Sequence, residues 1–150
     1  MKGRGRVDVM HGVNLDQLGH RDPSIYGDFS LSDLEIQVKD YARELDVRFG
    51  LSFFQSNFEG EYCEAIHRAR DRADGLIVNA GAWSHYSYAI RDALEVSQLP
   101  AVEVHLSDVE NREEWRRHSV IRDVCIGHVQ GKGPEGYREA LSMLHEALGR

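Results

Sequence analysis

The chain has 150 residues, 41% hydrophobic and 29% charged, which is enough to bury one sizeable core and typical of a globular protein. Its net charge of −7, from 18 basic and 25 acidic residues, argues against a nucleic-acid-binding surface and against docking on anionic lipid. No apolar run resembles a signal peptide or a bilayer span, so we expect a cytoplasmic protein. Cys63 and Cys125 lack metal-site spacing, and we expect two free thiols rather than a disulfide.

Five short apolar runs predict β-strands. In chain order they are VDVMH (7–11), LSFFQ (51–55), GLIVN (75–79), AVEVHL (101–106) and VCIGHV (124–129).

Segments of helical period separate these strands. From Leu34 to Leu45 the apolar residues recur in steps of four, three and four, and Ser32 and Glu35 have the spacing of a capping box. Four further helices are expected around residues 62–73, around 89–94, as a short polar helix over 111–118, and over 137–148. Strands alternating with helices predict parallel strands with helices on both faces. We therefore expect a single α/β domain over residues 1–150, with a flavodoxin-like, doubly wound, five-stranded parallel sheet.

Several polar residues follow the predicted strands, where ligands bind in such folds. Asn14 follows the first strand, Asn79 ends the third, and His105 lies near the end of the fourth. The loop GHRDPSIYG (19–27), which shows neither helical nor strand spacing, carries Arg21 and Tyr26 after the first strand. We expect all of these side chains to share one edge of the sheet.

The fourth strand is unusual because Glu103 and His105 share one of its faces. One interpretation is an edge strand with one wet face. In a second, the carboxylate orients the imidazole and favours its protonated form, so that His105 acts as a general acid. In a third, the two residues bind a metal together with His85, although no ligand cluster of known spacing supports this.

The segment after the third strand places His85 and Asp92 seven residues apart, about 10 Å along a helix. That distance is awkward for joint contact with one small substrate, and both side chains fit an ordinary helix surface as well. In ENREEWRRHS (110–119), Arg112 and Arg116 are either part of a solvated, ion-paired helix or, being close to His105, substrate ligands. The chain has no GxGxxG, GxxxxGK[ST], GxSxG or HExxH motif, which argues against nucleotide-dependent and serine-hydrolase chemistry.

Three long segments resemble type II 3-dehydroquinate dehydratase, in the same order and at matching separations. They are GVNLDQLGHRDPSIYG (12–27), NAGAWSHYSYAIRDAL (79–94) and VEVHLSDVENREEWRRHS (102–119). The resemblance implies a flavodoxin-like enzyme without metal or cofactor that forms trimers grouped as a dodecamer. It implies conversion of 3-dehydroquinate to 3-dehydroshikimate by anti elimination of water through an enolate, in shikimate biosynthesis or quinate breakdown.

The resemblance also implies roles for individual residues. Tyr26 would take the C2 proton with Arg21 beside it on a mobile lid, and Asn14 would hold a water that stabilises the enolate. His105, braced by Glu103, would protonate the departing C1 hydroxyl. Asp92 would reach into a neighbouring subunit's site, and Arg116 would lie nearby with a less certain role. The remaining substrate ligands would be Asn79, His85 and Arg112 for the ring hydroxyls and the backbone of Leu106 and Ser107 for the carboxylate.

This scheme explains why the loop carries an arginine beside a tyrosine. An ordinary tyrosine is ionised to only about one part in a thousand at pH 7, and an adjacent guanidinium favours the anion. Gly19 and Gly27 would then act as hinges of the lid. Taken alone, the loop also fits a structural role. Arg21 would then pair with a surface carboxylate, and Tyr26 would pack over the core.

Four positions depart from the family's usual pattern, and one of them is Trp115, where a smaller aromatic residue is usual. His11 and Val13 replace an asparagine and a proline before Asn14, and Asp108 replaces an asparagine near the expected carboxylate site. Two alternatives to the dehydratase therefore stay open. One is a catalytically weak relative that binds a small polyhydroxylated carboxylic acid as a sensor or scaffold. The other is a metal-dependent hydrolase that uses Glu103, His105 and His85.

Overall fold

The five predicted strands form one parallel sheet in the computed structural model, which describes residues 5–47 and 49–149. The strand order is β2-β1-β3-β4-β5, as in flavodoxin-like folds, and every pairing is parallel. The strand bounds are Gly5–His11 (β1), Phe49–Gln55 (β2), Gly75–Asn79 (β3), Ala101–His105 (β4) and Gly127–Gln130 (β5). The predicted fold class is confirmed.

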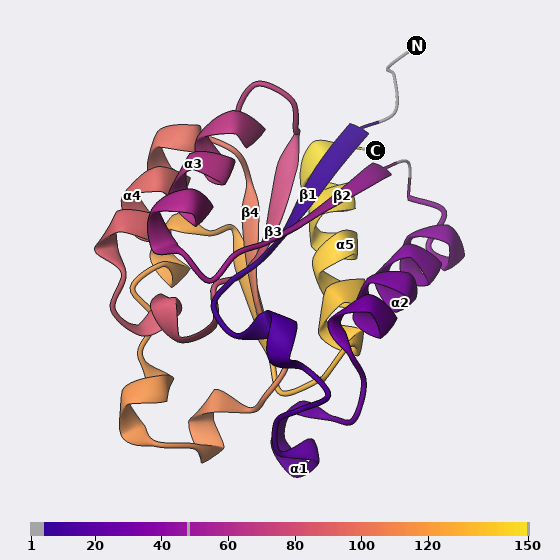
Figure 1. The fold of residues 1–150 in the computed structure, drawn as a ribbon. Coiled ribbons are helices and arrows are strands. Elements are labelled where there is room, and N and C mark those ends of the chain that lie inside the picture. Colours follow the sequence, from indigo (N-terminus) through magenta and orange to yellow (C-terminus); the bar gives the residue numbers. More distant parts are fainter. Residues whose placement is uncertain (1–4, 48, 150) are drawn as a thin grey trace.

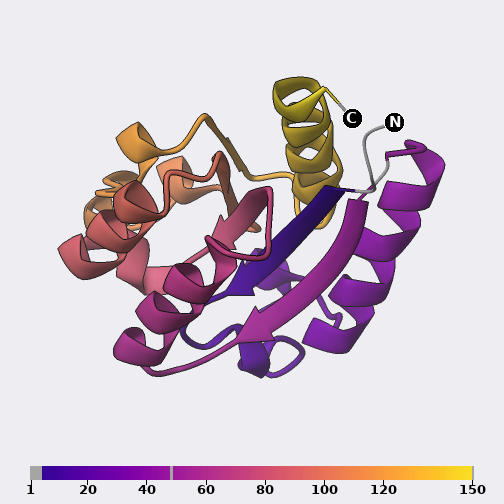
Figure 2. The same ribbon diagram turned by 90° about the horizontal axis from the view of Figure 1, so that it is seen from above.

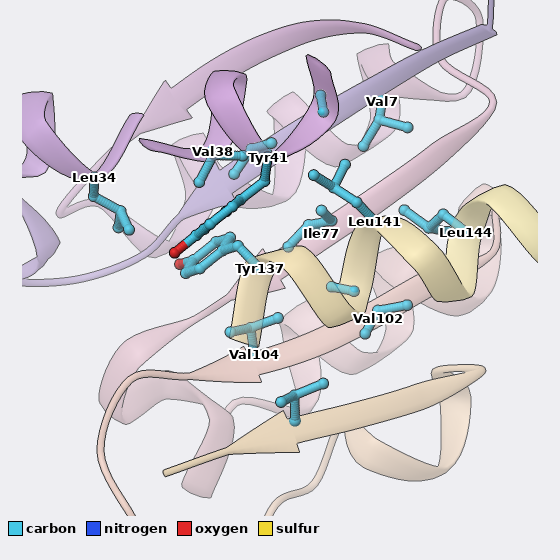
Figure 3. Packing of buried hydrophobic residues seen from close by; sticks show 14 of the residues in the cluster. Val7, Leu34, Val38, Tyr41, Ile77, Val102, Val104, Tyr137, Leu141 and Leu144 are labelled. Atoms are coloured by element: carbon cyan, nitrogen blue, oxygen red, sulfur yellow. The ribbon is translucent and has the colours of Figure 1, made fainter. Parts of the chain in front are cut away.

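Helices cover both faces of this sheet (Figures 1 and 2). Leu31–Glu44 (α2) and Glu135–Leu148 (α5) pack on one face, while Glu59–Ala69 (α3) and Tyr88–Ser97 (α4) pack on the other. Two buried clusters result, because each helix turns its apolar stripe toward the sheet. Figure 3 shows the first cluster, in which side chains of α2 and α5 meet over the sheet at residues such as Ile77 and Val104.

Several element boundaries differ from the predictions for local reasons. Helix α2 begins two residues earlier than predicted, and its capping box is formed by Ser30 and Asp33 rather than Ser32 and Glu35. The polar segment 111–118 forms no α-helix but contributes to two 3-10 turns, Val109–Asn111 (η3) and Glu114–Arg117 (η4).

Two more boundaries differ. Residue 124 belongs to the 3-10 turn Arg122–Val124 (η5), so β5 begins only at Gly127. Within the loop 19–27, Pro23–Tyr26 form one helical turn (α1), which begins where the Asp22 side chain accepts a hydrogen bond from the backbone N–H of Ser24.

The fourth strand is an inner strand, which rules out the edge-strand interpretation. It pairs with β3 on one side and β5 on the other, and all five of its residues are buried. Glu103 and His105 are therefore two ionisable side chains inside the protein, and such groups need partners.

The carboxyl ends of the strands meet at the lower edge of Figure 1, where α1, Leu15–Gln17 (η1), η3 and η4 lie beside one another. The amino-terminal end of β1 and the carboxyl-terminal end of α5 lie at the opposite edge. No helix among the described residues is both long and apolar enough to cross a membrane. Cys63 and Cys125 are free thiols, as predicted.

Candidate active site

A pocket opens at the carboxyl edge of the sheet and brings together segments that are distant in the sequence. Ten of the twelve predicted site residues line it: Asn14, Arg21, Tyr26, Asn79, His85, His105, Leu106, Ser107, Arg112 and Arg116. The prediction had not included six further lining residues: Val13, Leu15, Leu18, Gly81, Ala82 and Val109. These six have small or apolar side chains that carry no distinctive chemical signal in a sequence.

The turn α1 carries the predicted base. Gly19 and Gly27 flank the turn with φ angles of 93° and 83°, a left-handed conformation that favours glycine. In the loop just before this turn, Arg21 places its guanidinium carbon 3.8 Å from the centre of the Tyr26 ring. A cation at this distance from the aromatic face is favourable, so the predicted pairing of Arg21 with Tyr26 exists in the fold.

A second arginine also acts on Tyr26. Arg112 donates a hydrogen bond from Nη1 to the Tyr26 hydroxyl over 2.7 Å and lies 3.3 Å from Ser107 Oγ. The Arg112 Nε is buried and has no hydrogen-bond partner among the described residues. The sequence placed Arg112 at the pocket, but the two residues are 86 positions apart and no local pattern links them. Tyr26 is thus in contact with two guanidinium groups.

Across the pocket, His105 is held by a buried carboxylate. His105 Nε2 donates to Glu103 Oε2 over 2.7 Å, and Ser119 Oγ donates to the same oxygen over 2.6 Å. Arg122 Nε donates to Glu103 Oε1 over 3.1 Å. Burial by itself raises the pKa of Glu103, but the hydrogen bonds from His105 and Ser119 and the charges of His105 and Arg122 outweigh it and lower this pKa to about 2.

This ionised carboxylate fixes the orientation of the imidazole, because it can only accept a hydrogen bond and therefore keeps the proton on Nε2 of His105. The Glu103 side chain itself is fully buried behind His105 and does not line the pocket. The predicted pair is present, and it can stabilise a protonated imidazole. Ser119 and Arg122 were not predicted, since neither lies within a pattern that identifies a partner of Glu103.

His85 has different surroundings. Its Nδ1 donates to the backbone carbonyl of His118 over 2.7 Å, and its ring stacks on that of His105 with centres 6.2 Å apart. Burial lowers the pKa of His85 more than the bond to His118 raises it, and the charges of His105 and Arg116 lower it further. His85 is therefore neutral near pH 7, with Nε2 free to accept a hydrogen bond from a hydroxyl group.

Tight backbone contacts shape the floor of the pocket. A side chain at Gly12 would lie 2.4 Å from the Ala80 carbonyl oxygen, so β1 and the segment after β3 can approach only through glycine. Asn79 Oδ1 accepts from the Gly81 backbone over 3.1 Å. Asn14 has a left-handed φ of 67°, and its backbone N–H donates to Asn57 Oδ1 over 2.8 Å. The Asn79 side chain is thus held by the backbone of Gly81, and the Asn14 backbone is held by the side chain of Asn57.

Asp92 and Asp108 lie outside the pocket. Asp92 is exposed on α4, and it does not line the pocket of its own chain. The Asp108 carboxylate accepts from the Glu110 backbone over 3.2 Å and from Asn111 Nδ2 over 2.5 Å. Asp108 therefore caps the turn η3, and its carboxylate oxygens accept hydrogen bonds within that turn.

The substituted positions at the end of β1 are accommodated in two ways. His11 is buried under the sheet edge, where its Nε2 lies 3.2 Å from Glu35 Oε2 and its ring stacks on Phe53. Val13 is half-buried at the pocket wall. Within residues 5–47 and 49–149, no group of three or more His, Cys, Asp or Glu side chains is placed to hold a metal ion.

A flavodoxin-like sheet with a tyrosine and a histidine facing one pocket defines an α/β enzyme with an acid–base site. The model of the family described as Dehydroquinase class II matches residues 5–145, and the chain belongs to that family.

Curated relatives and solved structures agree with this assignment. A 3-dehydroquinate dehydratase of Thermotoga petrophila is 48% identical over 95% of this chain and 96% of its own. One of Bacillus pumilus is 46% identical over 91% of each chain. The crystal structure of a type II dehydroquinase from Butyrivibrio crossotus matches with a TM-score of 0.89 at 40% identity, covering 95% of this chain and 98% of that one.

Proposed function

We propose that this chain is a 3-dehydroquinate dehydratase, a hydro-lyase that removes water from 3-dehydroquinate to give 3-dehydroshikimate. One observation carries the proposal: a tyrosine bound by two arginines and a carboxylate-held histidine line the same pocket, in a member of the Dehydroquinase class II family. Such a pocket can remove a proton and protonate a leaving hydroxyl, which are the two halves of a dehydration.

In the first step, the Tyr26 phenolate takes the proton from C2 beside the ketone. The C–H electron pair becomes an enolate, whose negative charge is stabilised by a water held at Asn14. Two guanidinium groups beside Tyr26 support this role, because positive charge favours the phenolate over the phenol. We assign Arg21 and Arg112 to this stabilisation and thereby give Arg112 a role beyond contact with a ring hydroxyl.

In the second step, the enolate electrons form the double bond between C1 and C2 while the C1–O bond breaks. Protonated His105 donates to the departing oxygen, which leaves as water, because hydroxide is a poor leaving group near pH 7. Glu103 stabilises the protonated imidazole through its 2.7 Å hydrogen bond. The base and the acid act on opposite faces of the substrate, as an anti elimination requires.

Other lining residues would hold the substrate. Neutral His85 offers Nε2 as an acceptor, and Asn79 lines the same pocket at the end of β3, so we assign both to the ring hydroxyls. The backbone of Leu106 and Ser107 would bind the carboxylate. Arg116 also lines the pocket, where it is paired with Glu113 over 2.6 Å, and would add positive charge to the site.

The assembly completes the proposal. Asp92 would contact the substrate of a neighbouring subunit in a trimer, and such trimers would group as a dodecamer. This assignment is supported by the exposure of Asp92 outside its own pocket. We further propose that residues 1–150 act as one catalytic domain in the cytoplasm, in the shikimate pathway or in quinate breakdown, without a cofactor.

The direct test follows the ultraviolet absorbance of the conjugated enone product after 3-dehydroquinate is added to the purified chain with EDTA present. We expect absorbance to rise for the wild type with or without EDTA, and to stay at the background rate for Tyr26→Phe. No enone formation by the folded wild type would refute the dehydratase, and loss of activity only with EDTA would favour a metal-dependent enzyme.

A further inference from the structure

The Glu103 carboxylate is shared between the pocket and a second surface of the protein. On the pocket side it accepts the 2.7 Å bond from His105. On the other side it accepts from Arg122 Nε over 3.1 Å and from Ser119 Oγ over 2.6 Å. One buried negative charge thus faces two side chains that can both be positive.

Arg122 does not belong to the catalytic pocket. It lies on η5, and with Ser119 it lines a separate hollow between η5 and α4. The side chain is 29% exposed, while the carboxylate that it contacts is fully buried. Its Nη2 also lies 3.5 Å from Oε1 of Gln130, the residue that pairs with His105 in the sheet. Among the described residues, Arg122 makes no hydrogen bond to His105 itself, and the Glu103 carboxylate is the charged group that joins the two.

We propose that Arg122 is a positioning residue for the acid step: it shares the Glu103 carboxylate with His105 and so sets the pH at which His105 releases its proton. This inference rests on the proposed function, in which His105 protonates the leaving hydroxyl. Arg122 is always positively charged. Its charge partly offsets the negative charge of Glu103, so Glu103 stabilises the protonated form of His105 less than it would alone. A less firmly held proton makes His105 a better donor near neutral pH.

The other ionisable groups around Glu103 and His105 are the same in the wild type and in variants of Arg122. On the pocket side, His105 shares the lining with Arg21, Tyr26, His85, Arg112 and Arg116. Near Glu103, the charge of the carboxylate helps to raise the pKa of the Cys125 thiol. His128 is the register partner of Glu103 on β5, and its side chain is exposed. Asp123 forms an ion pair with Arg91 beside η5. Only Arg122 donates a hydrogen bond to Glu103 Oε1 among the described residues.

The test replaces the charge of Arg122 and follows the His105 proton directly. The pH titration of the His105 imidazole is measured by NMR, its signal being identified by its loss in His105→Asn. In Arg122→Gln we expect the midpoint to rise measurably, because Glu103 then stabilises protonated His105 alone. Arg122→Lys keeps the charge and should titrate like the wild type. Arg122→Met is a second uncharged variant, in case Gln impairs folding.

A matched control removes an arginine of similar exposure that is ion-paired elsewhere. Arg138 is 38% exposed and pairs with Glu44, so Arg138→Gln changes the net charge equally and should leave the His105 midpoint unchanged. An unchanged midpoint in the folded, uncharged Arg122 variants would overturn the proposal.

Kinetics separate this role from a purely structural one. In Arg122→Gln the alkaline limb of kcat/KM should move upward with the NMR midpoint, while KM stays within about twofold, because Arg122 does not contact the pocket. A uniform loss of kcat at every pH, without movement of the limb, would indicate only a loosened loop and would also overturn the proposal. The titration needs no turnover, so failure of the dehydratase assay and failure of this inference are distinguishable.

Discussion

At the scale of single residues, the chemistry of Tyr26 depends on its two arginine neighbours. Arg21 stacks over the ring and Arg112 binds the hydroxyl, so each can stabilise the phenolate by a different geometry. A phenol in water would be almost fully protonated at pH 7. The proposed role of Tyr26 as the base therefore depends on the two guanidinium groups that the fold brings to it.

Replacement of Arg21 should show this dependence. In Arg21→Ala we expect kcat to fall about 10- to 100-fold with only a modest change in KM, because the ionised base becomes rarer while most substrate contacts remain. Steady-state kinetics of enone formation measure both constants. Arg43→Ala, which removes an exposed arginine paired with Asp40 on α2, is the control and should match the wild type. Turnover of Arg21→Ala within a factor of about three of wild type would discard the assignment.

At the scale of elements, the turn α1 presents Tyr26 to the pocket through a glycine with positive φ. Gly27 has φ of 83°, and a Cβ there would lie 2.4 Å from Phe29 Cε1. The turn can therefore hold its present shape only with glycine at this position. Among its four residues only Tyr26 lines the pocket, and none of the four is fully buried.

Gly27→Ala should consequently affect activity more than stability. The added strain, about 1–3 kcal/mol, is relieved when the turn shifts, and this shift moves Tyr26 away from Arg112. We expect kcat to fall about tenfold or more, with a change in Tm of only a few degrees. The matched control is Gly149→Ala, which also has a positive φ but has open space around it at the end of α5. Wild-type turnover in Gly27→Ala would show that the shape of the turn does not matter.

At the scale of the whole molecule, helix α4 places none of its residues in the lining of its own chain's pocket. Asp92 is exposed and outside its own pocket, whereas the proposed assembly would bring it to a neighbour. This arrangement predicts that two differently inactivated subunits can repair each other.

The complementation experiment mixes Asp92→Asn with His105→Ala by refolding the two chains together. Each variant alone should lose most of its kcat, while random mixed oligomers should recover about a quarter of wild-type activity, since a quarter of the sites then have both groups intact. Glu95→Gln, an exposed carboxylate on the same helix, replaces Asp92→Asn in the control and should be active alone. Mixtures no more active than the sum of their separate components would place Asp92 outside the neighbouring site.

Comparison of sequence and structure shows which features are locally encoded. The five strands lie within a few residues of their predicted positions. Each was predicted from a short, mainly apolar run, and runs of four to eight residues are typical of strands and too short for most helices. The segment 111–118 was wrongly predicted as a helix, because its charged residues form 3-10 turns that no apolar stripe anchors to the core. Capping was misplaced by two residues, since Ser32 and Glu35 have the same spacing as the pair that forms the box.

By itself, the sequence determined the alternation of strands and helices, and with it the edge at which Asn14, Asn79 and His105 meet. Local sequence patterns encode this information, because the spacing of apolar residues indicates whether a segment is a helix or a strand. The carboxyl ends of parallel strands then lie at the same edge of the sheet. Only the tertiary structure decided that Arg112 binds Tyr26 and that Arg122 shares Glu103 with His105. These pairs depend on the paths of loops and on rotamers that packing selects, and contacts between distant segments leave no periodic pattern in a single chain.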